Sequence, residues 1–182
     1  SSRVARSGRT GDGGRLFATI VRLMVGTGVR VGELCKLTLD DLSPDCAVVH
    51  IHGKGARERV AYITDARLRK DLRRIVQRRR KSRLATAALF VNRHGAPMRP
   101  QSVRSRLRRL AKEAGLERRV TPHMLRHTAA TLLIETGVDI RFVQRLLGHS
   151  SIATTEIYTH VSDQALRATL ERADILGSLA GM

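Results

Sequence analysis

Apolar residues recur at helical spacing along most of the chain, and one short stretch of strand character interrupts this pattern. The interruption consists of two β-branched runs, residues 48–51 and 60–63, on either side of a glycine-bracketed turn at 53–55, and it predicts an antiparallel hairpin. Helical periodicity is found over residues 16–24, 30–37, 65–80, 102–114, 122–136, 140–147, 150–158 and 162–173. The pattern therefore predicts a mainly α protein with a small antiparallel β-sheet, an α+β fold.

Capping residues mark where two of these helices begin. Thr64 is predicted to cap the first basic helix, and Thr121 to cap a helix that starts at Pro122, the position that proline favours. Gly26 and Gly28 are expected to end the first helix of the chain. The buried face of the helix that starts at Pro122 is predicted to consist of Leu125, Ala129, Leu132 and Leu133.

Length and composition are those of one folded domain. The chain has 182 residues, of which 42% are hydrophobic, enough for a core. No apolar run approaches the roughly 18 residues that cross a bilayer, so no membrane partner is expected. Cys35 and Cys46 form neither a disulfide framework nor a metal-pair spacing, which favours a reducing, intracellular compartment.

The charge of the chain is strongly positive. It carries 34 Lys and Arg against 16 Asp and Glu, a net charge of +18, which indicates a polyanionic partner, nucleic acid first and an anionic membrane second. Residues 67–83 contain ten basic side chains and one acid, and residues 99–119 contain eight and two. The chain has no Trp and few aromatics, which disfavours single-strand binding by base stacking. Double-stranded DNA is therefore the expected partner.

Two cationic side chains stand at glycine turns. Arg30 opens a short helix, where its guanidinium and backbone N–H groups make an anion site, and Glu33 on the same helical face can hold that guanidinium. Lys54 lies between two glycines at the predicted hairpin tip, from which an ammonium reaches a phosphate or a leaving oxygen. Taken singly, each is an ordinary feature, a surface ion pair and a solvated lysine.

A third group of side chains lies on the helix after Thr121. His123, Arg126 and His127 are predicted to share one face while Leu125 turns to the core. Two imidazoles and a guanidinium without a local carboxylate suit an anion. The i, i+4 histidines also have zinc-ligand spacing, but Met124 replaces the glutamate of the zinc-protease motif and Arg126 places a cation beside the ion, so no metal is expected.

A fourth group follows the helix that ends at residue 147. His149 comes after the helix-ending Gly148, and Tyr158 follows nine residues later among Thr and Glu. The chain has two tyrosines, and Tyr62 lies in an apolar strand and is expected in the core. Strand cleavage without a water nucleophile needs an attacking side chain, cations for the charged transition state and a proton donor for the leaving oxygen. These four groups offer candidates for each.

Together these segments resemble one family, the tyrosine recombinases of the phage integrase family. The order Arg, Lys, His-x-x-Arg, His, Tyr and the strings TGVRVGEL, GKGARER, PHMLRHTAATLL and VQRLLGHSSIATTEIYTHV are similar to its bacterial and phage branch, which includes Xer-type enzymes. The resemblance covers roughly residues 16–161. It implies the catalytic-domain fold of that family and site-specific DNA breaking and rejoining.

The resemblance also implies roles for the residues that bind phosphate. Arg30 and Arg126 bind the scissile phosphate and stabilise its transition state, and Lys54 protonates the leaving 5′ oxygen. His149 donates a hydrogen bond to a phosphate oxygen, and Glu33 supports the site.

The nucleophile implied by the resemblance is Tyr158, with His123 as general acid and base towards it, whereas His127 is expected to serve structure. Because a free tyrosine has a pKa near ~10, its proton must leave as it attacks. With arginines, a lysine and histidines in place of Mg²⁺, cleavage is expected to need no metal and no cofactor, and to leave a 3′-phosphotyrosyl bond.

The expected organisation is a flexible leader over 1–14, a catalytic domain over 15–161 and a C-terminal helix or tail over 162–182. The tail is either exchanged between subunits or packed on its own domain. The N-terminal core-binding domain of the family is expected to be absent from this chain, and the full-length protein is expected to form a tetramer on DNA in the cytoplasm of a bacterium. Three alternatives stay open: a type IB topoisomerase, an inactive DNA-binding module of the same fold, and a metal-dependent nuclease.

Overall fold

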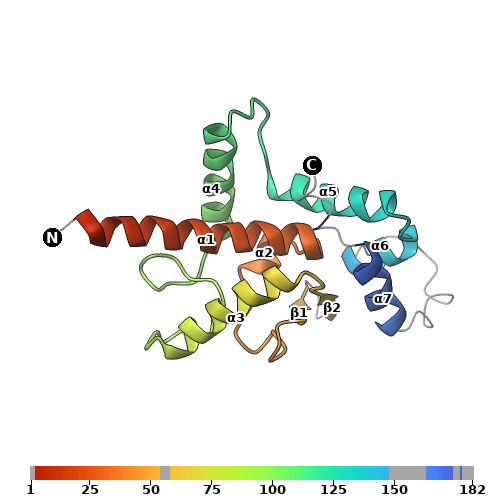
Figure 1. Ribbon diagram of the computed structural model, residues 1–182, viewed down its shortest axis with the longest axis horizontal. Coiled ribbons are helices and arrows are strands. Elements are labelled where there is room, and N and C mark those ends of the chain that lie inside the picture. The colour runs from red at the N-terminus through yellow and green to blue at the C-terminus, as the bar shows by residue number, and fades with distance from the viewer. Residues whose placement is uncertain (1–2, 54–57, 148–162, 174–176, 178–182) are drawn as a thin grey trace.

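A long N-terminal helix, α1 (Arg3–Thr27), forms the axis on which the other elements are arranged (Figure 1). The helix α4 (Pro100–Glu113) rises from one side of α1, and α3 (Ala66–Lys81) lies on the other side with the small sheet. The computed structural model describes residues 3–53, 58–147, 163–173 and 177. Within these residues the protein is mainly helical with one two-stranded antiparallel sheet, which confirms the predicted fold class.

The hairpin pairs β1 (Val48–His52) with β2 (Glu58–Tyr62) in antiparallel register. Val49 lies opposite Ala61 and Ile51 lies opposite Arg59. Val49, Ile51 and Ala61 are buried, so the inner face of the sheet also carries Arg59. An arginine is thus directed towards the interior of the protein.

Gly28 separates α1 from the four-residue helix α2 (Val31–Leu34). Its φ of +61° lies in the left-handed region, which strains any residue with a Cβ. Its N–H donates to the carbonyl of Met24 at 2.9 Å and completes the last turn of α1. The sharp turn places Arg30 at the N-cap of α2, as the sequence predicted.

The helix α5 (Pro122–Glu135) begins as predicted, because the hydroxyl of Thr121 accepts the N–H of Met124 at 3.3 Å. Its buried residues are Pro122, Arg126, Ala129 and Leu133. The predicted Leu125 is partly buried and packs against the core, but Arg126 was not predicted to belong to the buried face. The apolar stripe of this helix includes an arginine.

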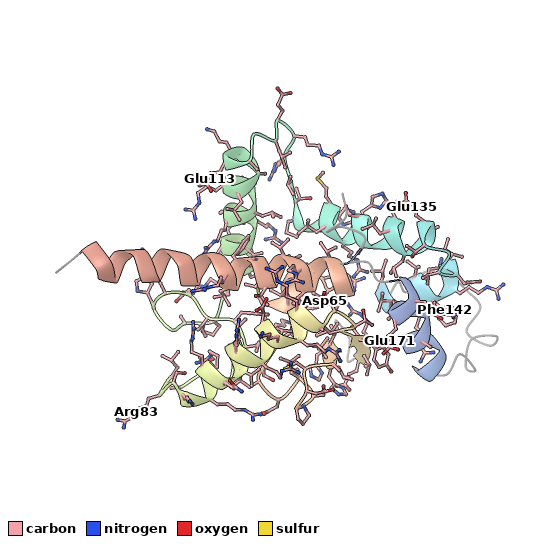
Figure 2. All side chains as sticks on the ribbon, in the orientation of Figure 1. Asp65, Arg83, Glu113, Glu135, Phe142 and Glu171 are labelled. Carbon is pink, nitrogen blue, oxygen red and sulfur yellow. The ribbon has the colours of Figure 1, made fainter. Side chains whose placement is uncertain are left out.

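The cap of α3 also differs from the prediction. Asp65, not Thr64, accepts the N–H of Leu68 at 2.5 Å. The same carboxylate accepts a hydrogen bond of 2.7 Å from Arg22 of α1, and Figure 2 shows Asp65 where α3 approaches α1. Asp65 caps α3 in place of Thr64 because its carboxylate binds both the first turn of the helix and Arg22.

The first helix begins well before the Leu16 expected from periodicity. It starts at Arg3, within the segment expected to be a leader, and Arg106 of α4 donates to the carbonyl of Gly13 at 2.6 Å. The guanidinium of Arg106 also lies 4.9 Å from the ring centroid of Phe17. These contacts with α4 are not visible in the local hydrophobic pattern.

At the other end of α1 lie α5, α6 (Ile140–Leu147) and α7 (Asp163–Ala173) (Figure 1). Leu170 and Ala173 of α7 are buried in the core of the chain, and Tyr62 is half-buried against that core. The C-terminal helix thus packs on its own domain in this structure. None of the helices in the described ranges is long and apolar enough to cross a membrane.

Candidate active site

The carboxylate of Glu33 lies at the centre of a group of arginines near the start of α2. Arg59 of β2 donates to it with Nη1 at 3.0 Å and with Nη2 at 2.8 Å. Arg30 donates with Nη1 at 3.0 Å and with its backbone N–H at 2.9 Å. The backbone contact is the half of a capping box in which the side chain three residues into the helix binds back to the cap. The predicted Arg30–Glu33 pair therefore exists, but a second arginine shares its carboxylate.

Burial and these donors act on Glu33 in opposite directions. Burial by itself raises the pKa of the carboxyl, but the hydrogen bonds from Arg59 and from the backbone of Arg30 outweigh it and hold the pKa below its ordinary value. The carboxylate is therefore ionised at neutral pH and keeps the two guanidinium groups in fixed positions.

Arg126 is buried on the other side of the Gly28 turn, with a relative exposure of 6%. Its Nη1 donates to the carbonyl of Gly28 at 2.5 Å, and its Nη2 donates to the carbonyl of Leu147. Burial, together with the charges of Arg30 and Arg59, lowers the pKa of Arg126 to about 10. The group is still a cation at neutral pH, in surroundings that are already positive.

The C-terminal end of α6 is fixed by two of these arginines. Arg59 donates Nε to the carbonyl of Leu146 at 3.0 Å, and Arg126 donates to the carbonyl of Leu147. The last carbonyls of a helix have no partner within it and carry the negative end of the helix dipole. Cations at these carbonyls are therefore stabilising, and they hold the end of α6 against β2 and α5.

Three of the residues predicted for the site come together in this way: Arg30, Glu33 and Arg126. His123 and His127 lie on the same helix as Arg126, but their side chains are exposed whereas Arg126 is buried. The three residues occupy i, i+3 and i+4 of α5 as predicted, but Arg126 is directed inward to the carbonyls of Gly28 and Leu147. The predicted Lys54, His149 and Tyr158 lie outside the described residues.

Arg59 is a site residue that the sequence reasoning did not single out. It lies in a charged run beside Glu58, just after the glycine turn. A signal was present in the strand, because Arg59 is in phase with the buried Ala61 and Ile63 at the two-residue period of a strand. An arginine at a core-facing strand position needs an internal partner, and Glu33 supplies it.

The group has the composition of an anion site. Two guanidinium groups bind the one carboxylate and a third, that of Arg126, lies near them, which leaves a positive excess. The Arg30 side chain is 46% exposed. Among the described residues no three His, Cys, Asp or Glu side chains are grouped as a metal site requires.

Comparison with known proteins decides the family. The model of the Phage integrase family matches residues 15–165, most of the chain. The chain belongs to the phage integrase family of tyrosine recombinases. Tyrosine recombinase XerC of Bacillus pumilus (strain SAFR-032) is 40% identical over 168 residues, which cover 86% of this chain and 53% of that protein. This chain therefore spans about half the length of the curated relatives that it matches.

Solved structures of this family have the same fold. XerA recombinase superposes with a TM-score of 0.69 at 35% identity, covering 85% of this chain and 60% of that one. XerH site-specific recombinase, crystallised with its difH substrate as a pre-cleavage complex, gives a TM-score of 0.66 at 30% identity, covering 85% of this chain and 45% of that one. The predicted family is thus confirmed by sequence and by fold.

Proposed function

We propose that this chain is the catalytic domain of a site-specific DNA recombinase that cuts and rejoins duplex DNA without a metal ion. The observation that carries the proposal is the placement of Arg30 and Arg126 on either side of the Gly28 turn, although α2 and α5 are distant in sequence. Guanidinium groups placed in advance around a phosphate stabilise the charge of its transition state.

Glu33 is proposed to make this arrangement possible. Three guanidinium groups repel one another, and one ionised carboxylate offsets part of that repulsion while leaving a positive excess for the phosphate. The carboxylate is buried, with a side-chain exposure of 9%, and its oxygens already accept bonds from Arg30 and Arg59. Its role is therefore to hold arginines rather than to act on DNA.

The remaining steps are assigned to residues that match the family motif. The phenolic oxygen of Tyr158 attacks the phosphorus, a new O–P bond forms, and the bond to the 5′ oxygen breaks. Lys54 gives its proton to that 5′ oxygen, and His123 or a phosphate oxygen takes the phenolic proton. His149 donates a hydrogen bond to a phosphate oxygen. The exposed position of His123 on α5 leaves it open to a substrate.

The same proposal extends to the whole protein. The chain is proposed to be the part that follows a DNA-binding N-terminal domain, which the coverage of about half of each relative supports. Tetramers on DNA are proposed for the longer protein, which would act on DNA in the bacterial cytoplasm. His127 is assigned no step in the reaction.

A covalent-trapping assay tests the reaction. A nicked half-site duplex is first selected from a randomised library on the immobilised chain, and is then incubated with the wild type and with Tyr158→Phe. We expect a covalent protein–DNA band with the wild type alone, of equal intensity in buffer with EDTA. A band that EDTA abolishes refutes metal independence, and a band that Tyr158→Phe retains refutes the nucleophile.

The alternatives give different outcomes in the same experiment. An inactive DNA-binding module shifts the duplex but forms no covalent band. A metal-dependent nuclease gives free cut ends and no adduct. A type IB topoisomerase forms the adduct, relaxes a plasmid that carries one site, and fails to exchange strands between two sites.

A further inference from the structure

Arg59 has no step in the mechanism proposed above, yet its side chain contacts two other elements of the site. Its Nη1 and Nη2 donate to the two oxygens of Glu33 at 3.0 and 2.8 Å, and its Nε donates to the carbonyl of Leu146 at 3.0 Å. A guanidinium has a fixed planar fork, so contacts made with all three nitrogens fix its orientation. One side chain thus joins β2, α2 and the end of α6.

We propose that Arg59 is a positioning residue for strand cleavage, one that sets the relative placement of three segments which each lead to a proposed catalytic side chain. Through Glu33 it fixes the guanidinium of Arg30. Through Leu146 it fixes the end of α6, three residues before His149. Through its own strand it anchors the hairpin that carries Lys54. This inference rests on the proposed strand-cleavage function.

The geometry argues that Arg59 does not itself bind phosphate. Its side chain is 13% exposed, whereas that of Arg30 is 46% exposed. Each of its nitrogens already donates to an internal acceptor. A residue of this kind affects the rate through the geometry of its neighbours, and contributes little to the affinity for DNA.

The bidentate contact also explains why a lysine cannot replace it. An ammonium is a point charge on a flexible stem, and it cannot hold both oxygens of a carboxylate and a separate carbonyl in one plane. The expected consequence of a loosened contact is misplacement of Arg30 and of the end of α6. Displacement of a positioned group by about 1 Å costs about 10²-fold in rate.

The test uses the full chain with the selected nicked half-site duplex and measures two quantities separately. Dissociation constants come from binding titrations, and cleavage rates come from single turnovers at saturating protein. We expect Arg59→Met to bind DNA within about 2-fold of the wild type and to cleave about 10²-fold more slowly. Arg59→Lys is expected to cleave at an intermediate rate.

Arg79 provides a matched control for the loss of a buried arginine. Arg79 lies in the last turn of α3 and is also buried, at 7% relative exposure. Its Nε and Nη2 donate to the carbonyls of Ala88 and Thr86. Arg79→Met is expected to lower the melting temperature and to leave the single-turnover rate unchanged. Equal rate losses in Arg59→Met and Arg79→Met would reduce Arg59 to a general stabilising residue and overturn the inference.

Two further measurements separate positioning from general destabilisation. If Arg59 acts through Glu33, then Arg59→Met combined with Glu33→Gln should cleave no more slowly than the slower single variant. If the losses in cleavage rate of the two single variants add up in the double variant, then Arg59 does not act through Glu33. Removing Arg59 also removes a cause of the lowered pKa of Glu33, so the acid limb of the rate profile should move to higher pH in Arg59→Met.

The outcomes for the two proposals are distinct. A wild type that forms no adduct overturns the proposed function and, with it, this inference. A wild type that forms the adduct while Arg59→Met cleaves at the same rate overturns the inference alone.

Discussion

Arg126 donates a hydrogen bond of 2.5 Å from Nη1 to the carbonyl oxygen of Gly28, across 98 residues of sequence. The acceptor belongs to the turn that leads into Arg30, so the two proposed phosphate ligands are aligned through the backbone and not through contact with each other. Two neighbouring cations repel one another, and the carbonyl dipoles of Gly28 and Leu147 supply fixed negative ends that offset this. Arg126 and the turn before Arg30 are therefore held in place by contacts within the protein itself.

The first prediction concerns Arg126→Lys. The surroundings that lower the pKa of Arg126 to about 10 will lower that of a lysine, ordinarily about 10.4, towards neutrality. A lysine with a depressed pKa carries its charge below that pKa and loses it as the pH rises. The cleavage rate of the variant should therefore fall between about pH 7 and 9, a range in which an arginine stays charged, as measured by single-turnover cleavage.

The wild type is the control in this experiment, because its arginine stays charged across the same range. A flat pH profile for Arg126→Lys would contradict the prediction and indicate that the charge at this position is not needed. An ammonium lacks the planar fork that reaches both carbonyls, so the variant should also unfold more easily by about 1.5–3 kcal/mol.

The second prediction compares two glycines of the same turn region. Gly28 has a φ of +61°, and a Cβ there would overlap the buried Leu147. Gly28→Ala should destabilise the protein by at least about 1–2 kcal/mol from the backbone alone, with displacement of Leu147 adding to this. Urea unfolding followed by circular dichroism measures the change.

Gly32 is the matched position. It lies within α2, and a Cβ there meets nothing within 4 Å. Gly32→Ala should be neutral or stabilise the protein by up to about 0.5–1 kcal/mol, because alanine loses less backbone freedom in a helix. Equal destabilisation by both substitutions would argue against a specific role for the left-handed turn.

Local sequence signals were enough for part of the site. The Arg30–Glu33 pair follows from i, i+3 spacing after a glycine turn, and the cap at Thr121 follows from its place before Pro122. Each of these contacts lies within four residues of sequence. Such contacts are set by local backbone geometry, which the sequence pattern reflects directly.

The orientation of Arg126 and the role of Arg59 depend on long-range contacts. A basic residue on a helix or strand is ordinarily assigned to the solvent side, and the predicted buried face of α5 therefore did not include Arg126. The stripe Pro122, Arg126, Ala129 and Leu133 is nevertheless continuous. Arg126 can be buried because the carbonyls of Gly28 and Leu147 accept its hydrogen bonds. Glu33 does the same for Arg59, and in both cases the acceptors come from other elements.

The third prediction concerns a histidine between two carboxylates on the hairpin. His52 approaches Asp41 with Nε2 at 2.8 Å and Glu58 with Nδ1 at 2.9 Å. These contacts raise the pKa of His52, the one with Asp41 most. Both ring nitrogens donate only in the protonated imidazolium. The stabilisation that His52 provides is therefore complete below the ordinary histidine pKa of about 6.5. This stabilisation is lost as the pH rises through the raised pKa of His52.

The measurement is the melting temperature of the wild type and of His52→Gln across about pH 5 to 8.5. The wild type should be the more stable at the acid end of this range, and the difference should shrink as the pH rises. A difference that is constant with pH would contradict the assignment. The contribution of Asp41 to stability changes with pH in the opposite direction. Hydrogen bonds from Thr38 and His52 outweigh burial and lower the pKa of Asp41, so its contribution is lost only when the pH falls far into the acid range.

The last prediction concerns which basic surface meets the phosphate backbone of DNA. The helix α4 packs against α2, the element that Arg30 caps, and the charge of Arg104 acts on the thiol of Cys35 at the end of α2. The exposed basic side chains of α4 therefore border the proposed site. Arg83 lies just beyond the far end of α3, away from α5 and α6 (Figure 2). DNA seated on the arginine group should contact α4 and not this end of α3.

Two double variants with equal loss of charge separate these surfaces: Arg104→Gln with Arg108→Gln on α4, and Arg80→Gln with Arg83→Gln at the end of α3. Each phosphate contact contributes about 0.9 to the slope of log affinity against log salt concentration. The α4 pair should lower the magnitude of that slope by nearly 2, whereas the α3 pair should change it by less than about 0.5. The reverse order, measured by fluorescence anisotropy with the selected duplex, would place the DNA on the α3 side of α1.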